Sequence, residues 1–107
     1  MLALKPDFNK GQNGLLPAIV QDATTLQVLM LGYVNSESFE MTLNTKKVTF
    51  YSRSRQEIWI KGETSGNYFD LVEYKLDCDQ DTILFLVNPH GPACHRGTTT
   101  CFDEEMT

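Results

Sequence analysis

Short apolar runs alternate with polar turns along most of the chain, which is the pattern of β-strands and not of long helices. Six runs predict strands: Leu15–Gln21, Gln27–Tyr33, Val48–Ser52, Glu57–Ile60, Phe69–Leu76 and Ile83–Val87. The first two runs flank Asp22–Thr25, whose small polar residues suit a hairpin turn. Most of the regular structure is therefore expected to be strand.

One segment predicts a helix. Asn35 has the side chain of an N-cap, and Glu37 follows in the first turn, where the helix dipole favours a negative charge. Val34 and Phe39 have the spacing of a hydrophobic staple across that cap. We expect the helix to end near Asn44. Together with the strands it predicts a β-rich α+β fold with one main helix.

Composition sets the size of the fold and excludes two kinds of partner. With 107 residues, 41% hydrophobic and 21% charged, residues 1–107 are expected to form one globular domain with a thin core that dimerisation would help. The longest apolar runs, Leu15–Val20 and Val28–Leu31, are too short to span a bilayer, so no membrane role is expected. A net charge of -5 argues against binding nucleic acid.

Compartment can be inferred from the N-terminus and the cysteines. Met1–Asp7 lacks the basic start and apolar run of a secretion signal. Three cysteines are an odd number, which fits a disulfide framework poorly. Burial as small hydrophobes and one disulfide with a leftover thiol are the plain alternatives. We expect reduced thiols and a cytoplasmic location.

The pentapeptide 77–81 has three carboxylates at every second position, Asp77, Asp79 and Asp81, with Cys78 between the first two. If it continues the preceding strand, the period of two places the carboxylates on one face and the thiol on the other. Mg²⁺ prefers carboxylate oxygens and Zn²⁺ binds thiolate well, so the alternation would sort ligands for two metals.

This acidic segment has two alternatives to a two-metal strand. An EF-hand calcium loop is excluded, because Thr82 stands where the loop needs glycine and Asn88 stands where it needs glutamate. A solvated acidic hairpin turn stays open, because Asp and Gln are ordinary turn residues.

The C-terminal segment Gly91–Cys101 contains two further thiols, Cys94 and Cys101, among glycine, proline and threonine. Their spacing is not the Cys-x-x-Cys of structural zinc sites, so the motif alone is only moderately specific. Together with Cys78, three thiols would leave one position of a tetrahedral zinc open. An open position is typical of catalytic zinc.

The chain has two histidines, His90 and His95. His95 is either the fourth ligand of a closed site or a proton shuttle beside an open one. Its adjacency to Cys94 favours the shuttle, because neighbouring side chains in an extended loop point apart. His90 lacks such context and is expected to be an exposed loop residue.

Two polar stretches, Ser52–Arg55 and Lys61–Asn67, contain the groups that hold phosphate: cations, hydroxyls and glycine-exposed amides. They favour an anionic small molecule as the ligand of an otherwise acidic chain. Solvated strand ends and turns are the alternative, and Trp59 either stacks on a base or belongs to the core. The candidate substrate contacts are Arg53, Arg55, Trp59, Lys61, Thr64 and Ser65.

Several segments in order resemble the phosphoribosyl-AMP cyclohydrolase family of histidine biosynthesis. The matching segments are GLLPAIVQD (14–22), VLMLGY (28–33), SRSR (52–55), WIKGETSGN (59–67), DCDQD (77–81) and GPACHRG (91–97). The resemblance covers about Gly14 to Phe102 and shows no departure at a metal position.

The resemblance implies a set of metal ligands and an oligomeric state. It implies Mg²⁺ at Asp77, Asp79 and Asp81, and zinc at Cys78, Cys94 and Cys101. It also implies that Cys78 reaches the zinc held by the other two cysteines of the partner subunit. An intertwined homodimer is therefore expected.

The implied reaction adds water at C6 of an N1-ribosylated adenine and breaks the N1–C6 bond. Three thiolates over-neutralise zinc and make its water less acidic, so a base is needed, and His95 is the candidate. The alternative from another class is a small zinc-stabilised nucleotide-binding module in which His95 closes the site. A nucleotide deaminase fits less well, because its His-x-Glu and Pro-Cys-x-x-Cys motifs are absent.

Overall fold

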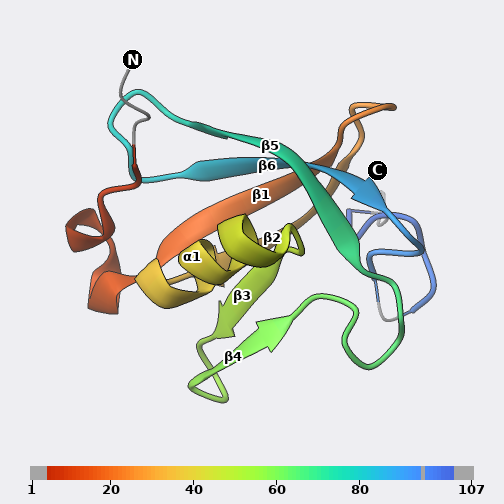
Figure 1. Ribbon diagram of the computed structural model, residues 1–107, viewed down its shortest axis with the longest axis horizontal. Coiled ribbons are helices and arrows are strands. Elements are labelled where there is room, and N and C mark those ends of the chain that lie inside the picture. The colour runs from red at the N-terminus through yellow and green to blue at the C-terminus, as the bar shows by residue number, and fades with distance from the viewer. Residues whose placement is uncertain (1–4, 95, 103–107) are drawn as a thin grey trace, which may run out of the picture.

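A computed structural model describes residues 5–94 and 96–102 and has the predicted α+β fold with one α-helix in these ranges (Figure 1). The elements are two 3-10 turns, η1 (Phe8–Lys10) and η2 (Gln12–Gly14), the helix α1 (Ser36–Thr45), and the strands β1 (Leu16–Asp22), β2 (Val28–Val34), β3 (Thr49–Ser52), β4 (Glu57–Ile60), β5 (Phe69–Leu76) and β6 (Ile83–Pro89). The six predicted strands are confirmed, with ends displaced by two residues or fewer.

The strands form two sheets. The larger sheet has the order β2-β1-β6-β5, and β3 pairs with β4 in a separate hairpin. β1 and β6 are parallel, whereas β1–β2 and β5–β6 are antiparallel. Because β6 runs parallel to β1, the turn before β6 lies at the end of the sheet where β1 begins and β2 finishes. The N-terminal 3-10 turns lie at this end as well (Figure 1).

α1 begins as the sequence predicts. The Asn35 side chain accepts a hydrogen bond from the backbone N–H of Ser38 at 2.8 Å, and the Ser38 hydroxyl accepts one from the N–H of Asn35 at 3.0 Å. This reciprocal capping box satisfies two amides that the helix leaves unpaired. Val34 and Phe39, on either side of the cap, are both buried. The helix ends at Thr45, one residue beyond the prediction.

The core lies between α1, β3 and one face of the larger sheet. Phe39 of α1 packs against Phe85 and Tyr74 of the sheet, with ring centroids 6.3 and 5.2 Å apart, and against Phe8 of η1 at 6.0 Å. These contacts fix the helix and the N-terminal turns on the same sheet. Within the described ranges, no helix has the length and apolar character needed to cross a membrane.

Candidate functional site

The acidic segment is a turn and does not continue strand β5, which ends at Leu76. The Asp77 carboxylate accepts hydrogen bonds from the backbone N–H groups of Asp81 at 3.0 Å and Thr82 at 3.1 Å. Gln80 has a left-handed backbone, with φ of 65°. The conditional expectation of strand alternation was therefore wrong, and the hairpin-turn reading gave the right backbone. The turn brings the carboxylates together by folding the chain back on itself.

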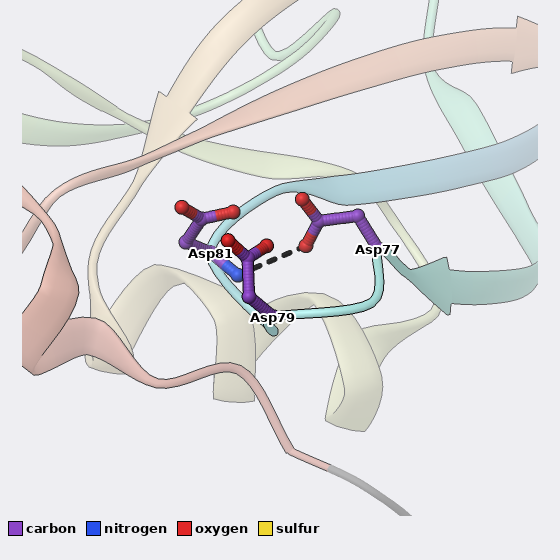
Figure 2. Close-up of side chains that lie close together, drawn as sticks. All are labelled: Asp77, Asp79 and Asp81. Carbon is purple, nitrogen blue, oxygen red and sulfur yellow. Dashed lines mark hydrogen bonds between the residues drawn. The ribbon is translucent and has the colours of Figure 1, made fainter.

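The three carboxylates nevertheless meet. One oxygen from each of Asp77, Asp79 and Asp81 lies within 4.8 Å of the others, and Figure 2 shows the side chains gathered on one side of the turn. Opposite oxygens in a magnesium shell are about 4.2 Å apart, so small side-chain rotations would bring these oxygens onto one ion. Asp77 and Asp79 are exposed and Asp81 is half-buried, so the group is open to solvent on one side.

The closeness of the three carboxyls shifts the pKa values of two of them in opposite directions. Hydrogen bonding with Asp77 and then Asp79 raises the pKa of Asp81. Desolvation acts to raise the pKa of Asp77, but hydrogen bonds with Asp81 and Asp79 and from the amides of Thr82 and Asp81 outweigh it and lower that pKa. Like charges at this spacing favour sharing of a proton, and a divalent cation would relieve the same repulsion.

The N-terminal segment holds the acidic turn in place. The N–H of Asp7 donates to the carbonyl of Gln80 at 2.8 Å, and the ammonium of Lys10 donates to the carbonyl of Asp79 at 2.6 Å. Sequence reasoning missed this role for Lys10, because no local pattern links residues that are 69 positions apart.

The second candidate region is the cysteine loop, residues 91–102 without the undescribed position 95. Its backbone forms a tight turn: the N–H of Cys94 donates to Thr98 and the N–H of Gly97 donates back to Cys94, at 3.2 and 2.9 Å. Gly97 has φ of +86°, a conformation that suits glycine. The N–H of Cys101 donates to Leu29 at 2.7 Å, which fastens the loop to β2.

The two thiols of this loop are close enough to affect each other's ionisation. Hydrogen bonds from the backbone N–H of Arg96 and from the Thr98 side chain lower the pKa of Cys94 to about 7. Desolvation, and then the charge of neighbouring Cys94, raise the pKa of Cys101. Zinc binds thiolate, and the lowered pKa gives Cys94 a substantial thiolate fraction at neutral pH. A bound cation would also favour ionisation of Cys101.

Cys78 lies far from the other two cysteines within one chain. It sits in the turn before β6, whereas the cysteine loop follows β6, and Figure 1 shows the two segments at opposite ends of the molecule. The seven residues of β6 alone span roughly 20 Å at 3.3 Å per residue. Zinc–sulfur bonds are about 2.3 Å long. One chain's three thiols therefore cannot meet on one zinc in this fold.

His95 lies outside the described residues, and its proposed role stays a prediction. His90 is exposed, as expected, but it has a partner that sequence reasoning missed. Its Nε2 lies 2.5 Å from a carboxylate oxygen of Asp70, whose other oxygen pairs with the Lys47 ammonium at 3.0 Å. These residues come together because Lys47 bridges to β5 at Asp70 and His90 directly follows β6.

The predicted substrate contacts do not form one cluster. Arg55 is exposed and pairs with Glu57 at 3.3 Å. Trp59 packs against Phe50 with ring centroids 5.1 Å apart, and it also lines an open cavity of about 520 Å³. The ammonium of Lys61 donates to the carbonyl of Ala93 at 2.6 Å, beside the cysteine loop.

Thr64 and Ser65 lie in an exposed turn after β4. The Ser65 hydroxyl accepts a hydrogen bond from the N–H of Asn67 at 3.2 Å. Arg53 lies elsewhere, in the β3–β4 turn, and lines a cavity that Asp81 also lines. The polar stretches are thus divided between the two ends of the molecule.

A carboxylate triad and a thiol pair are donor sets that metallohydrolases use. The family model for phosphoribosyl-AMP cyclohydrolase matches residues 30–103. A phosphoribosyl-AMP cyclohydrolase of Lactiplantibacillus plantarum is 58% identical over 99 residues, covering 92% of this chain and 91% of that protein. The chain therefore belongs to the phosphoribosyl-AMP cyclohydrolase family and is an enzyme of this type.

Longer relatives contain the same region. The histidine biosynthesis bifunctional protein HisIE of Photobacterium profundum is 59% identical over 93 residues, and that of Bacillus subtilis is 57% identical over 96 residues. The chain spans 45% and 46% of these two proteins, so it covers about half the length of its bifunctional relatives.

Proposed function

We propose that this chain catalyses the third step of histidine biosynthesis, the hydrolysis of the N1–C6 bond in the adenine ring of 1-(5-phosphoribosyl)-AMP. The observation that carries the proposal is the 58% identity to a phosphoribosyl-AMP cyclohydrolase of which the chain covers 91%. The candidate ligands between Asp77 and Cys101 all lie inside the span matched by the family model.

We propose magnesium at the acidic turn. The gathered oxygens of Asp77, Asp79 and Asp81 suit a hard cation that keeps positions for water and phosphate. The backbone bonds to Asp77 and the tether from Lys10 hold the turn in shape before any ion binds. The residues present therefore fit this metal.

We propose zinc at the thiols, where it would supply a water acidified toward neutral pH. Cys94 and Cys101 would provide two ligands and Cys78 of the second subunit the third. The separation of Cys78 from the cysteine loop within one chain supports a shared site. The enzyme would then be a homodimer with two equivalent zinc sites, as expected for an isologous pair.

An apolar row on the larger sheet supports pairing of two subunits. Ile19 of β1 stands directly opposite Leu31 of β2 and beside Leu84 of β6, so the three side chains share one face. Leu31 is 44% exposed, and Ile19 and Leu84 are only partly buried. Covering such a row would add to the small core of one 107-residue chain.

In the proposed reaction, a C–O bond forms at C6, the N1–C6 bond breaks, and the proton lost by water is returned to N1. His95 is the proposed carrier of that proton, since it is next to Cys94 in the sequence and histidine titrates near neutral pH. Cations of the chain would offset the charge of the two substrate phosphates.

The test is to incubate the purified protein with phosphoribosyl-AMP, zinc and magnesium and to follow ring opening by ultraviolet absorbance. We expect turnover that needs both metals. A closed four-ligand zinc without bound water, together with an unchanged nucleotide spectrum, would contradict the proposal and favour the non-catalytic binding module.

A further inference from the structure

A cavity of about 740 Å³ opens beside the acidic turn. The N-terminal 3-10 turns line it with Lys10 and Asn13, and the β3–β4 turn lines it with Arg53. Tyr33 of β2 and Asp81 also line the cavity. The cavity exists because β1 and β6 are parallel, which places the acidic turn at the end of the sheet where β2 finishes.

Arg53 is oriented in this cavity by an aromatic ring. Its guanidinium carbon lies 3.8 Å from the centroid of the Tyr33 ring, a cation–π contact. Among residues 5–94 and 96–102, no carboxylate or carbonyl takes a hydrogen bond from this guanidinium. Neighbouring Arg55, by contrast, pairs with Glu57. Arg53 therefore presents a positioned and uncommitted donor fork to the cavity.

Lys10 adds a second cation to the cavity lining, beside the acidic turn. The Lys10 ammonium uses one hydrogen bond on the carbonyl of Asp79, which leaves two of its three donors for a ligand. Arg53, Lys10 and the magnesium proposed at Asp81 would surround one region of the cavity with positive charge. Phosphate is the ligand that this combination of fork, ammonium and hard cation recognises.

We propose that this cavity binds one 5-phosphoribosyl group, with its phosphate between Arg53, Lys10 and the metal of the acidic turn. The inference rests on the proposed function, because the substrate of that reaction carries two such groups. The cavity volume lies in the range of small-molecule sites and admits a sugar phosphate. Asn13, Gln56 and Tyr51 provide polar groups along the walls for the ribose hydroxyls.

The test is calorimetric titration of the metal-loaded protein with ribose 5-phosphate. We expect Arg53→Ala to weaken binding by about 10- to 100-fold, the usual cost of a lost charge-assisted contact. Arg53→Lys should weaken it less, because it keeps the charge but loses the fork. The matched control is Arg55→Ala, which removes an arginine from the same turn and should stay within about twofold of wild type.

Further titrations measure what magnesium, Lys10 and the ribose each contribute to binding. Omitting magnesium should weaken ribose 5-phosphate binding, and Lys10→Ala should weaken it as well. Inorganic phosphate should bind more weakly than ribose 5-phosphate, because it makes no ribose contacts. Equal affinity for the two probes would overturn the phosphoribosyl assignment.

Unchanged binding in a folded Arg53→Ala, or an equal loss in Arg55→Ala, would overturn the site itself. If Arg53→Ala does not fold, Arg53→Gln and Lys10→Ala decide the same question. A different result would reject the proposed function but not the site: wild type binds ribose 5-phosphate through Arg53 but does not open the ring of phosphoribosyl-AMP. If the enzyme opens the ring but neither Arg53→Ala nor Lys10→Ala weakens ribose 5-phosphate binding, the proposed phosphate site is wrong and the proposed function stands.

Discussion

The acidic turn before β6 and the cysteine loop after β6 are held in different ways. The acidic turn is shaped largely by its own residues, because the Asp77 side chain binds two amides of the same turn. The cysteine loop is shaped by backbone hydrogen bonds of its own, Cys101 is fastened to β2, and Lys61, which follows β4, binds its backbone. The acidic turn is thus built around one aspartate side chain and tethered to the N-terminal segment, whereas the cysteine loop is built on backbone bonds and tethered to β2 and Lys61.

The two ends also differ in completeness. The acidic turn brings all three proposed magnesium ligands together within one chain. The cysteine loop brings together only two of the three proposed zinc ligands, and the third lies beyond the length of β6. Under the proposed ligand assignments, magnesium binding would be a property of the monomer and zinc binding a property of the pair. Changes at the two ends should therefore be separable.

The largest expected effect is at the cysteine-loop end. His95→Ala should keep zinc but lower turnover by about 10²- to 10⁴-fold, the usual contribution of a general acid–base. The matched control is His90→Ala, which removes the histidine paired with Asp70 and should change turnover far less. Zinc content measured on both variants checks the account. Loss of zinc from His95→Ala would make this histidine a ligand and would argue against an open site.

A smaller effect is expected at the acidic turn. Asp79→Asn should raise the magnesium concentration for half-maximal turnover at least tenfold, because it removes the negative charge of a proposed direct ligand and even outer-shell partners contribute 10- to 100-fold. Zinc content should stay at the wild-type level. Glu73→Gln, on an exposed position of β5, is the control and should leave the magnesium requirement unchanged. Stoichiometric loss of zinc from Asp79→Asn would show that the two ends are not independent.

The smallest effect concerns stability near the start of the cysteine loop. Hydrogen bonding to His90 and then to Lys47 lowers the pKa of Asp70. A carboxyl whose pKa is lowered in the folded state stabilises the protein at pH values above its unfolded-state pKa. This stabilisation is lost as the pH falls through the folded-state pKa. Asp70→Asn should therefore cost about 0.5 to 1 kcal/mol at pH 6, as is usual for exposed pairs, and almost nothing near pH 2.

Urea unfolding at the two pH values measures this difference, and Asp22→Asn, at the end of strand β1, changes an aspartate in another part of the sheet and serves as control. A stability loss for Asp70→Asn that is the same at both pH values would show that the Asp70 charge is not its source.

Sequence patterns predicted the elements well because their signals are local. Alternation and the cap at Asn35 placed the strands and α1 to within two residues. The acidic segment was harder, because strand alternation and a turn both bring Asp77, Asp79 and Asp81 near one another. The deciding contacts are backbone hydrogen bonds to Asp77, which composition does not reveal.

The sites were predictable as residue types and not as an arrangement. Cys94 and Cys101 were identified from their context, and the structure does bring them together. Three features were not predicted: the hydrogen bond from Lys10 to the acidic turn, the pairing of His90 with Asp70, and the division of the polar stretches between two ends of the molecule. Each depends on the strand order, and the parallel pairing of β1 with β6 has no signature in a single sequence.

The central claim is that zinc is shared between two subunits, and mixing two variants tests it. Cys78→Ser and Cys101→Ser homodimers should each lack one ligand at both sites. In the mixed dimer, one site takes Cys78 from the Cys101→Ser chain and an intact Cys94–Cys101 pair from the Cys78→Ser chain. That site is complete, while the other carries both defects.

The decisive measurement is zinc content and turnover after the two variants are unfolded and refolded together. Random pairing makes about half of the dimers mixed, each with one complete site, so about a quarter of wild-type zinc and activity should return. Each variant refolded alone should show neither. If confirmed mixed dimers bind no zinc while wild type refolded in the same way is fully active, the shared site is wrong.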